Sequence, residues 1–234
     1  MSRSNPNVNA PNPAVRWFEW NGEHGVVRYY DKDAKKNVDV PLPFSFLLLD
    51  EVASVRGWHD ASESGIYSNE VRDTRTDPFV VKSFKGGTLA EGLYKDIKDR
   101  LHTLGAQYVA NCYVGFKNGG DGLSIGSLRF KGAALGAWME FRKACHGSLY
   151  NKAVDIDGFS EGKKGRITFR MPTFRPKDVS PETNTIAKEL DVELQAWLTS
   201  YFSRRTSDQT EPSVPDTEPP TTMNEPLTDD DIPF

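Results

Sequence analysis

The segment 108–116, YVANCYVGF, is joined by the turn KNGGDG to the segment 123–130, LSIGSLRF. Successive side chains of a β-strand point to opposite faces, so Cys112 belongs to one face while Tyr113 and Lys117 belong to the other. The glycines of the turn can adopt the positive φ values that a tight connection needs. This stretch therefore predicts an antiparallel hairpin with one apolar face, and the fold is expected to build outward from it.

Shorter patterns of the same kind surround this hairpin. They predict further strands at 15–20, 25–30, 44–58, 79–84 and 166–174, the first two joined by a hairpin-like turn at Asn21-Gly22. Most aromatic residues of such strands belong to a core face. The phenylalanines expected to pack in the core are Phe18, Phe44, Phe46, Phe84, Phe116 and Phe169.

Three amphipathic patterns predict helices. The first begins at the capping box Thr88-x-x-Glu91 and ends at Gly105. The second covers about 133–146, and the third starts at Ser180-Pro181, a favourable cap and first-turn pair. The expected class is mainly β with helices (α+β), and an OB-fold-like five-stranded barrel with inserted and appended helices is the natural candidate. Periodicity alone does not separate this barrel from other α+β sheets.

The composition limits the class of protein. A hydrophobic content of 37% with 11% aromatics is enough for a folded core and excludes a wholly disordered chain. The longest apolar run, 44–49, is far shorter than a membrane span, and the N-terminus does not resemble a secretory signal. The two cysteines, Cys112 and Cys145, form no CxxC pair, which indicates a reducing compartment without disulfides or a zinc cluster. We therefore expect a cytoplasmic protein that does not enter a membrane, with Cys112 as a small core residue.

Charge is distributed unevenly along the chain. The residues from Asp208 onward include eight acids and no lysine or arginine, which leaves 29 basic and 25 acidic residues before them. Such asymmetry is typical of a body that meets a polyanion and a tail that meets a basic pocket, although a merely solubilising tail explains it too. Polar and proline-rich stretches predict a flexible N-terminus at 1–13, one folded domain at 14–205 and a disordered acidic tail at 206–234.

The last six residues carry the most specific motif. They are Asp229, Asp230, Asp231, Ile232, Pro233 and Phe234. The Phe234 ring can fill a shallow pocket while its terminal carboxylate meets a basic residue, and the aspartates add electrostatic steering. Such a device works at the end of a chain, where this one lies.

On this motif the chain resembles the bacterial single-stranded DNA-binding proteins, whose polar tails end in this kind of acidic tip. Its body is longer and more helical than theirs and looks closer to the single-stranded DNA-binding proteins of tailed phages. The resemblance implies an OB-fold body that coats single-stranded DNA during replication, recombination and repair. It also implies that the tip recruits replication and repair proteins of the bacterial host.

Single-strand binding needs aromatic faces for the bases and cations for the backbone. Basic and aromatic residues interleave on several predicted strands. The candidate DNA contacts are Arg16, Trp17, Arg28, Tyr30, Tyr113, Lys117, Arg129, Lys131, Lys163, Lys164, Arg166 and Arg170. Tyr113 is the preferred base-stacking residue, because Lys117 shares its face. The pair Lys163-Lys164 lies in a glycine-flanked turn suited to phosphate contact.

Enzymatic motifs are weak. The sequence has no P-loop, and its four histidines lack metal-ligand spacing. Asp155-x-Asp157 could hold a metal from one strand face, but Gly158 and Ser160 favour an ordinary turn. We therefore assign no catalytic residue, metal or cofactor. A metal-dependent nuclease or other DNA-processing enzyme is the first alternative, and an annealing or duplex-binding recombination factor is the second. Homo-oligomer formation and duplex binding remain open.

Overall fold

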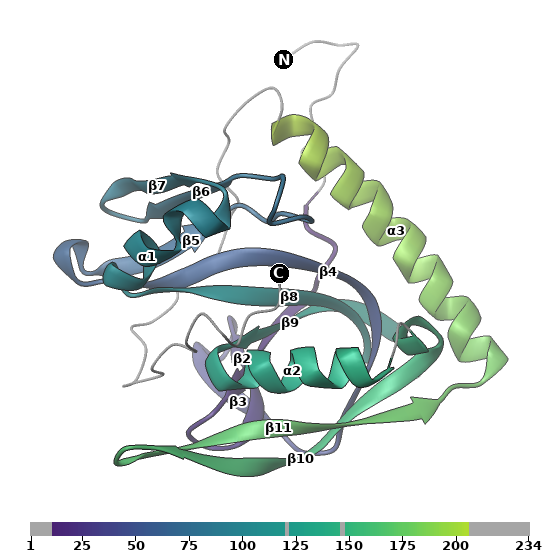
Figure 1. The fold of residues 1–234 in the computed structure, drawn as a ribbon. Helices are drawn as coiled ribbons and strands as arrows, with labels where there is room; N and C mark the ends of the chain where they lie inside the picture. The colour runs from purple at the N-terminus through teal and green to yellow at the C-terminus, as the bar shows by residue number, and fades with distance from the viewer. Residues whose placement is uncertain (1–10, 120–121, 146–147, 206–234) are drawn as a thin grey trace, which may run out of the picture.

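The computed structural model describes residues 11–119, 122–145 and 148–205 (Figure 1). Its three α-helices are α1 (Tyr94–Thr103), α2 (Gly132–Cys145) and α3 (Pro181–Arg205), with short 3-10 turns at Asp60–Ser62 and Ser148–Asn151. Its strands are β1 (Arg16–Asn21), β2 (Val26–Asp31), β3 (Lys36–Val40), β4 (Phe44–His59), β5 (Ser64–Ser68), β6 (Phe79–Ser83), β7 (Gly87–Gly92), β8 (Ala106–Lys117), β9 (Leu123–Lys131), β10 (Lys152–Lys164) and β11 (Ile167–Asp178).

All described strands join one large sheet in the order β3-β2-β1-β9-β8-β4-β5-β6-β7, and β10 pairs with both β4 and β11. The mixed class of strands with helices is therefore confirmed. The five-stranded barrel is not confirmed, because the sheet has 11 strands and is open. The predicted hairpin β1–β2 joins this sheet through a parallel pairing of β1 with β9.

The long strand β4 divides the molecule into two parts. Its first residues, 44–47, pair with β10, and most of its length pairs with β8. The register shifts between Leu48 and Asp50, where a bulge places one extra residue in β4. Beyond the bulge, Asp50 lies opposite Tyr113 and Glu51 lies opposite Cys112. The end of β4 pairs with β5 and so carries the small unit β5–β6–β7–α1 (Figure 1).

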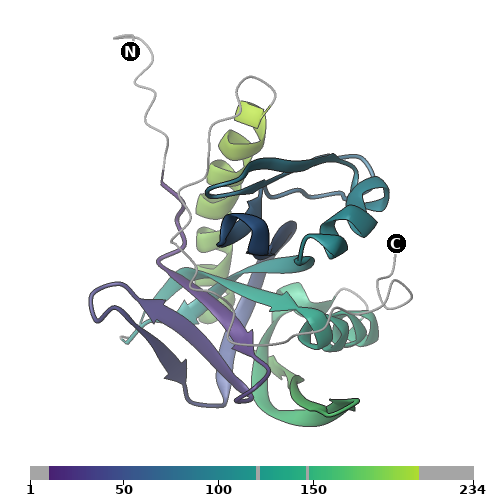
Figure 2. The ribbon, with the colours of Figure 1, turned by 90° about the vertical axis from the view of Figure 1, so that its left-hand side faces the viewer.

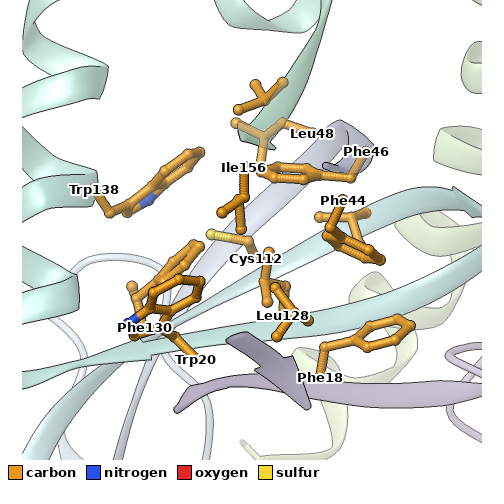
Figure 3. Packing of buried hydrophobic residues seen from close by; sticks show 14 of the residues in the cluster. Phe18, Trp20, Phe44, Phe46, Leu48, Cys112, Leu128, Phe130, Trp138 and Ile156 are labelled. Carbon is orange, nitrogen blue, oxygen red and sulfur yellow. The ribbon is translucent and has the colours of Figure 1, made fainter. Parts of the chain in front are cut away.

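The main core lies between the inner face of β4–β8–β9 and helix α2. Trp138 of α2 is fully buried, stacks on Phe130 at 5.1 Å between ring centroids, and meets Phe46 at 6.1 Å (Figure 3). Its Nε1 donates a hydrogen bond of 2.8 Å to Glu51 Oε2. Cys112 is buried here as predicted, and burial raises the pKa of its thiol well above the usual value.

The predicted core phenylalanines are mostly confirmed. Phe18, Phe44, Phe46 and Phe116 are buried. The prediction for Phe84 is wrong, since this side chain is 39% exposed and stacks on Tyr67, outside the main core, with 4.7 Å between the ring centroids. Phe169 is half-buried on β11.

Helix α1 begins later than the sequence predicts. The capping-box residues Thr88 and Glu91 belong to β7, where they pair with β6, and the helix starts at Tyr94 without a side-chain cap. Pairing with a neighbouring strand therefore outweighs the local capping signal. The predicted stop is confirmed, because Gly105 has a φ of +77° directly after this helix.

Helix α3 covers the outer face of the sheet, on the side opposite α2 (Figures 1 and 2). Its predicted start is confirmed, since the Ser180 hydroxyl accepts a hydrogen bond of 3.2 Å from the Thr183 amide. Leu194 and Leu198 of α3 are fully buried against Leu49, Val52, Tyr113 and Ile125. None of the described helices is long and apolar enough to cross a membrane.

Gly57 on β4 lies against the turn that follows α1. A Cβ atom at Gly57 would lie 2.2 Å from the carbonyl oxygen of Gly105. Backbone cannot move aside as a flexible side chain can, so Gly57→Ala is expected to lower the free energy of unfolding by about 1–3 kcal/mol. Urea denaturation measures this, with Gly122→Ala as the control because its Cβ would meet no atom within 4 Å. Equal unfolding midpoints for the two variants would contradict the prediction.

Candidate nucleic-acid interface

The predicted DNA-contacting residues of the body fall into three groups in the structure. One group lies on the β10–β11 hairpin and the adjoining last residue of β9, one on β1–β2, and one on β8 and the rest of β9. In that order they are Lys131, Lys163, Lys164, Arg166 and Arg170; then Arg16, Trp17, Arg28 and Tyr30; then Tyr113, Lys117 and Arg129. Each group has a different degree of exposure and a different set of partners.

The tip of the β10–β11 hairpin is the most accessible basic element among them. Lys163, Lys164 and Arg166 are all exposed there. Gly165 has a φ of +60°, which lets the chain reverse tightly between the two strands. The turn therefore lies at Gly165 and Arg166, later than the predicted 162–165, and Lys163 and Lys164 pair with β11 as the last residues of β10. Three cations on a short hairpin tip are suited to a phosphate backbone.

A small pocket lies between this hairpin, β1 and the start of α2. Its lining includes Trp20, Lys131, Phe169 and Arg170. Arg170 contacts residues on both sides of the pocket. Its carbonyl accepts a 2.7 Å hydrogen bond from Trp20 Nε1, and its guanidinium lies 5.2 Å from the Phe159 ring centroid. The Arg170 guanidinium also donates to the Glu23 carbonyl. The structure thus brings Lys131 and Arg170 together, with Arg170 tied to protein partners.

The β1–β2 group is largely engaged within the protein. Arg28 pairs with Asp39 at 2.7 Å, and Arg16 lies 4.5 Å from the centroid of the Tyr29 ring. The Trp17 ring packs against the residues beneath α3. Tyr30 is 43% exposed, so within this group it has the most open aromatic face.

Tyr113 does not have the exposed ring that base stacking requires. The alternation along β8 is as predicted, but α3 covers the outer face and leaves Tyr113 with 0% exposure. Its ring lies 6.0 Å from that of Trp197, and its hydroxyl donates a hydrogen bond of 2.8 Å to Glu70 Oε2. The proposal that Tyr113 stacks on bases is therefore wrong for this conformation. Lys117, at the end of the same strand, is exposed as expected.

Charged groups gather beneath the C-terminal half of α3. Arg129 of β9 and Arg56 of β4 face the same carboxylate, Glu70. The Nε atoms of both arginines are buried and have no hydrogen-bond partner among the described residues. Glu70 accepts hydrogen bonds from Tyr113 and, at 3.0 Å, from Asn111 Nδ2.

Burial shifts the pKa values of Arg56, Glu70 and Arg129. It lowers the pKa of Arg129, and burial together with the like charge of Arg129 lowers the pKa of Arg56 from 12.5 to about 9. Burial also raises the pKa of Glu70 above 4.5, against the opposing effect of the Tyr113 hydrogen bond. Glu70 acts on both arginines, and Glu19 of β1, the register partner of Arg129, acts on Arg129 as well. Enclosing two guanidinium groups is costly unless carboxylates or another anion offset their charge.

Sequence reasoning named Arg129 but missed Arg56 and Glu70. The alternation Ala53, Ser54, Val55, Arg56 at the end of β4 was the available signal, because it places Ser54 and Arg56 on one strand face. Glu70 lies outside the strands, and no local pattern points to it.

The raised pKa of Glu70 predicts a pH dependence of stability. In the folded state the neutral acid is favoured, so as pH rises from 4.5 the unfolded chain ionises first and stability falls until the folded-state pKa is passed. The fall is at most about 1.4 kcal/mol per pH unit. Glu70→Gln cannot ionise and should lack this contribution. Urea denaturation from pH 4.5 upward measures the difference between wild type and variant, and a difference that stays constant would contradict the assignment.

The Asp155-x-Asp157 motif is part of strand β10 and not of a turn. Asp157 accepts hydrogen bonds from Thr173 Oγ1, at 2.9 Å, and from Arg175. Asp155 accepts one from Ser45 Oγ and lies 4.0 Å from Lys177 Nζ. Within the described ranges, no group of three His, Cys, Asp or Glu side chains is placed to hold a metal ion.

The predicted partner-binding tip, Asp229 to Phe234, lies outside the described residues. Comparison with known proteins adds no relative, since no family model, no curated protein and no solved structure matches this chain. The functional argument therefore depends on the residues and the geometry of this molecule.

Proposed function

We propose that this protein is a non-catalytic single-stranded DNA-binding protein with an OB-like body. The observation that carries the proposal is the arrangement of five strands. These strands follow one another in the chain as β4, β8, β9, β10 and β11. In the sheet they lie in the order β9-β8-β4-β10-β11, and α2 connects the third strand, β9, to the fourth, β10. This matches the strand order of the Greek-key OB barrel. The other strands are additions to that unit.

The positions of the candidate residues support this proposal. OB-folds bind oligonucleotides on their second and third strands and on the loops after strands one and four. Here the second and third strands are β8 and β9, which carry Lys117, Arg129 and Lys131. The loop after the fourth strand is the hairpin tip with Lys163, Lys164 and Arg166. Cations thus recur on the elements that such a fold uses.

The acidic tip supports the second half of the proposal. Its carboxylates and terminal aromatic residue suit a basic, shallow pocket on another protein. We propose that the body holds single-stranded DNA during replication, recombination and repair while the tip recruits proteins acting on that DNA. Transfer of the six terminal residues to an unrelated soluble protein, followed by partner capture, tests the tip apart from the body.

Fluorescence anisotropy with a labelled oligo-dT tests DNA binding by the intact protein. We expect tight binding that weakens with salt, because binding releases counterions from phosphates. A duplex competitor should displace the oligonucleotide poorly. Absence of binding at low salt would overturn the proposal. Equal competition by duplex would favour an annealing or duplex-binding factor, and magnesium-dependent cleavage of the oligonucleotide would favour a nuclease.

A further inference from the structure

Helix α3 lies on the face of the sheet that the proposed function assigns to DNA. Its buried stripe covers Tyr113 of β8 and Ile125 of β9. Toward its C-terminal end, the Tyr201 hydroxyl accepts a hydrogen bond of 2.9 Å from the backbone N–H of Glu70. DNA could not contact the β8–β9 face in this region while α3 remains docked.

The sheet does not need α3 for its own continuity. All described strands pair with one another without it, and the main core contains no α3 residue (Figure 3). The helix is held by a separate apolar cluster and by a small polar network. In that network Gln195 donates to Asp50 Oδ2 at 2.9 Å and accepts from Arg72 Nη2 at 2.7 Å.

Polar and charged residues lie on both sides of this contact. Over its full range, 181–205, α3 has the acids Glu182, Glu189, Asp191 and Glu193 and the bases Lys188, Arg204 and Arg205, with no acid after Glu193. The face beside α3 carries Arg56 and Arg129, which are half-buried and whose buried Nε atoms lack partners among the described residues. The helix therefore lies over this face without accepting a hydrogen bond from those Nε atoms. A phosphodiester backbone can supply the missing acceptors.

We propose that α3 is a displaceable cover over a phosphate-binding face formed by Arg56 and Arg129, and that single-stranded DNA binds this face when α3 undocks. This inference rests on the proposed single-strand binding. The apparent association constant then equals that of the open form multiplied by the fraction of molecules that are open. Any change that weakens α3 docking raises that fraction and tightens DNA binding.

Hydrogen–deuterium exchange on the intact wild-type protein tests the cover directly. On addition of oligo-dT, amides of α3 should exchange faster while amides of β8 and β9 become more protected. Unchanged or slower exchange along α3 in the presence of bound DNA would overturn the proposal. This readout depends on the movement of the helix and not on any substitution.

Variants of the contact test the same idea through affinity. Leu198→Ala removes a fully buried α3 side chain and should tighten oligo-dT binding about tenfold or more. Gln195→Ala removes polar anchors without a core cavity, and should tighten binding to a smaller extent. Leu101→Ala, in the separate cluster beneath α1, creates a comparable cavity away from α3 and should not tighten binding.

A combined variant identifies the covered face as the DNA site. Adding Arg129→Met to Leu198→Ala keeps much of the side-chain length but removes the charge, and should abolish the gain in affinity. If neither wild type nor any variant binds oligo-dT, the proposed function fails together with the cover. If wild type binds but neither α3 variant binds more tightly and α3 stays protected, only the cover fails.

Discussion

Replacing Tyr113 with alanine is expected to lower the free energy of unfolding by about 3–5 kcal/mol, as for other large aromatic residues removed from a core. The side chain has 0% exposure, contacts Trp197 of α3, and donates a hydrogen bond to Glu70. Truncation would leave a cavity beneath α3 and remove a donor from a buried carboxylate. Urea denaturation monitored by circular dichroism measures the effect.

Two further variants separate the origins of this loss. Tyr113→Phe keeps the ring and removes the hydroxyl, so it should cost about 1–3 kcal/mol through the hydrogen bond alone. Tyr30→Ala is the matched control, because that tyrosine is 43% exposed and its loss should change stability by less than about 0.5 kcal/mol. If Tyr113→Ala were as mild as Tyr30→Ala, α3 would not enclose Tyr113 in solution.

Removing the three cations of the hairpin tip is expected to weaken oligo-dT binding strongly. If Lys163, Lys164 and Arg166 each neutralise one phosphate, their loss lowers the salt slope by about 2 and the affinity by roughly 100-fold at about 0.1 M salt. The three side chains are exposed, so the triple alanine variant should unfold at nearly the wild-type urea concentration. Anisotropy titrations over a series of salt concentrations measure both quantities.

The control for this variant carries the same loss of charge elsewhere. Lys36, Lys95 and Lys143 are exposed on β3, α1 and α2, away from the hairpin tip. Their triple replacement by alanine changes the net charge by the same amount, so it reports only the general electrostatic attraction of the protein for DNA. Equal losses of affinity and slope for the two triple variants would show that the hairpin tip makes no particular contact.

Much of the local structure followed from the sequence. The β8–β9 hairpin, helix α2 and the start of α3 at Ser180 were predicted from alternation, periodicity and a capping hydroxyl. These signals act over a few residues, because strand alternation and helix capping are properties of the local backbone. The predicted helix start at Thr88 failed because a non-local interaction, the pairing of β7 with β6, outweighed the local signal for a helix.

The candidate site followed from the sequence only in part. The exposed cations Lys163 and Lys164 beside a chain reversal were recognised because the glycine turn signal is local, although both residues belong to the end of β10. The cluster of Arg56, Glu70 and Arg129 was not, since its members come from two strands and a loop that meet only in the folded chain. The tip motif at Asp229–Phe234 remains a prediction from the sequence alone.

Tyr113 separates what the sequence determines from what the tertiary structure decides. The sequence by itself determined that Tyr113 and Lys117 share a strand face opposite Cys112, because a strand has a side-chain period of two. Only the tertiary structure decided that this face is covered at Tyr113 and open at Lys117, since the cover is a helix supplied from far along the chain. A period in one strand assigns side chains to faces, whereas burial of a face depends on what packs against it.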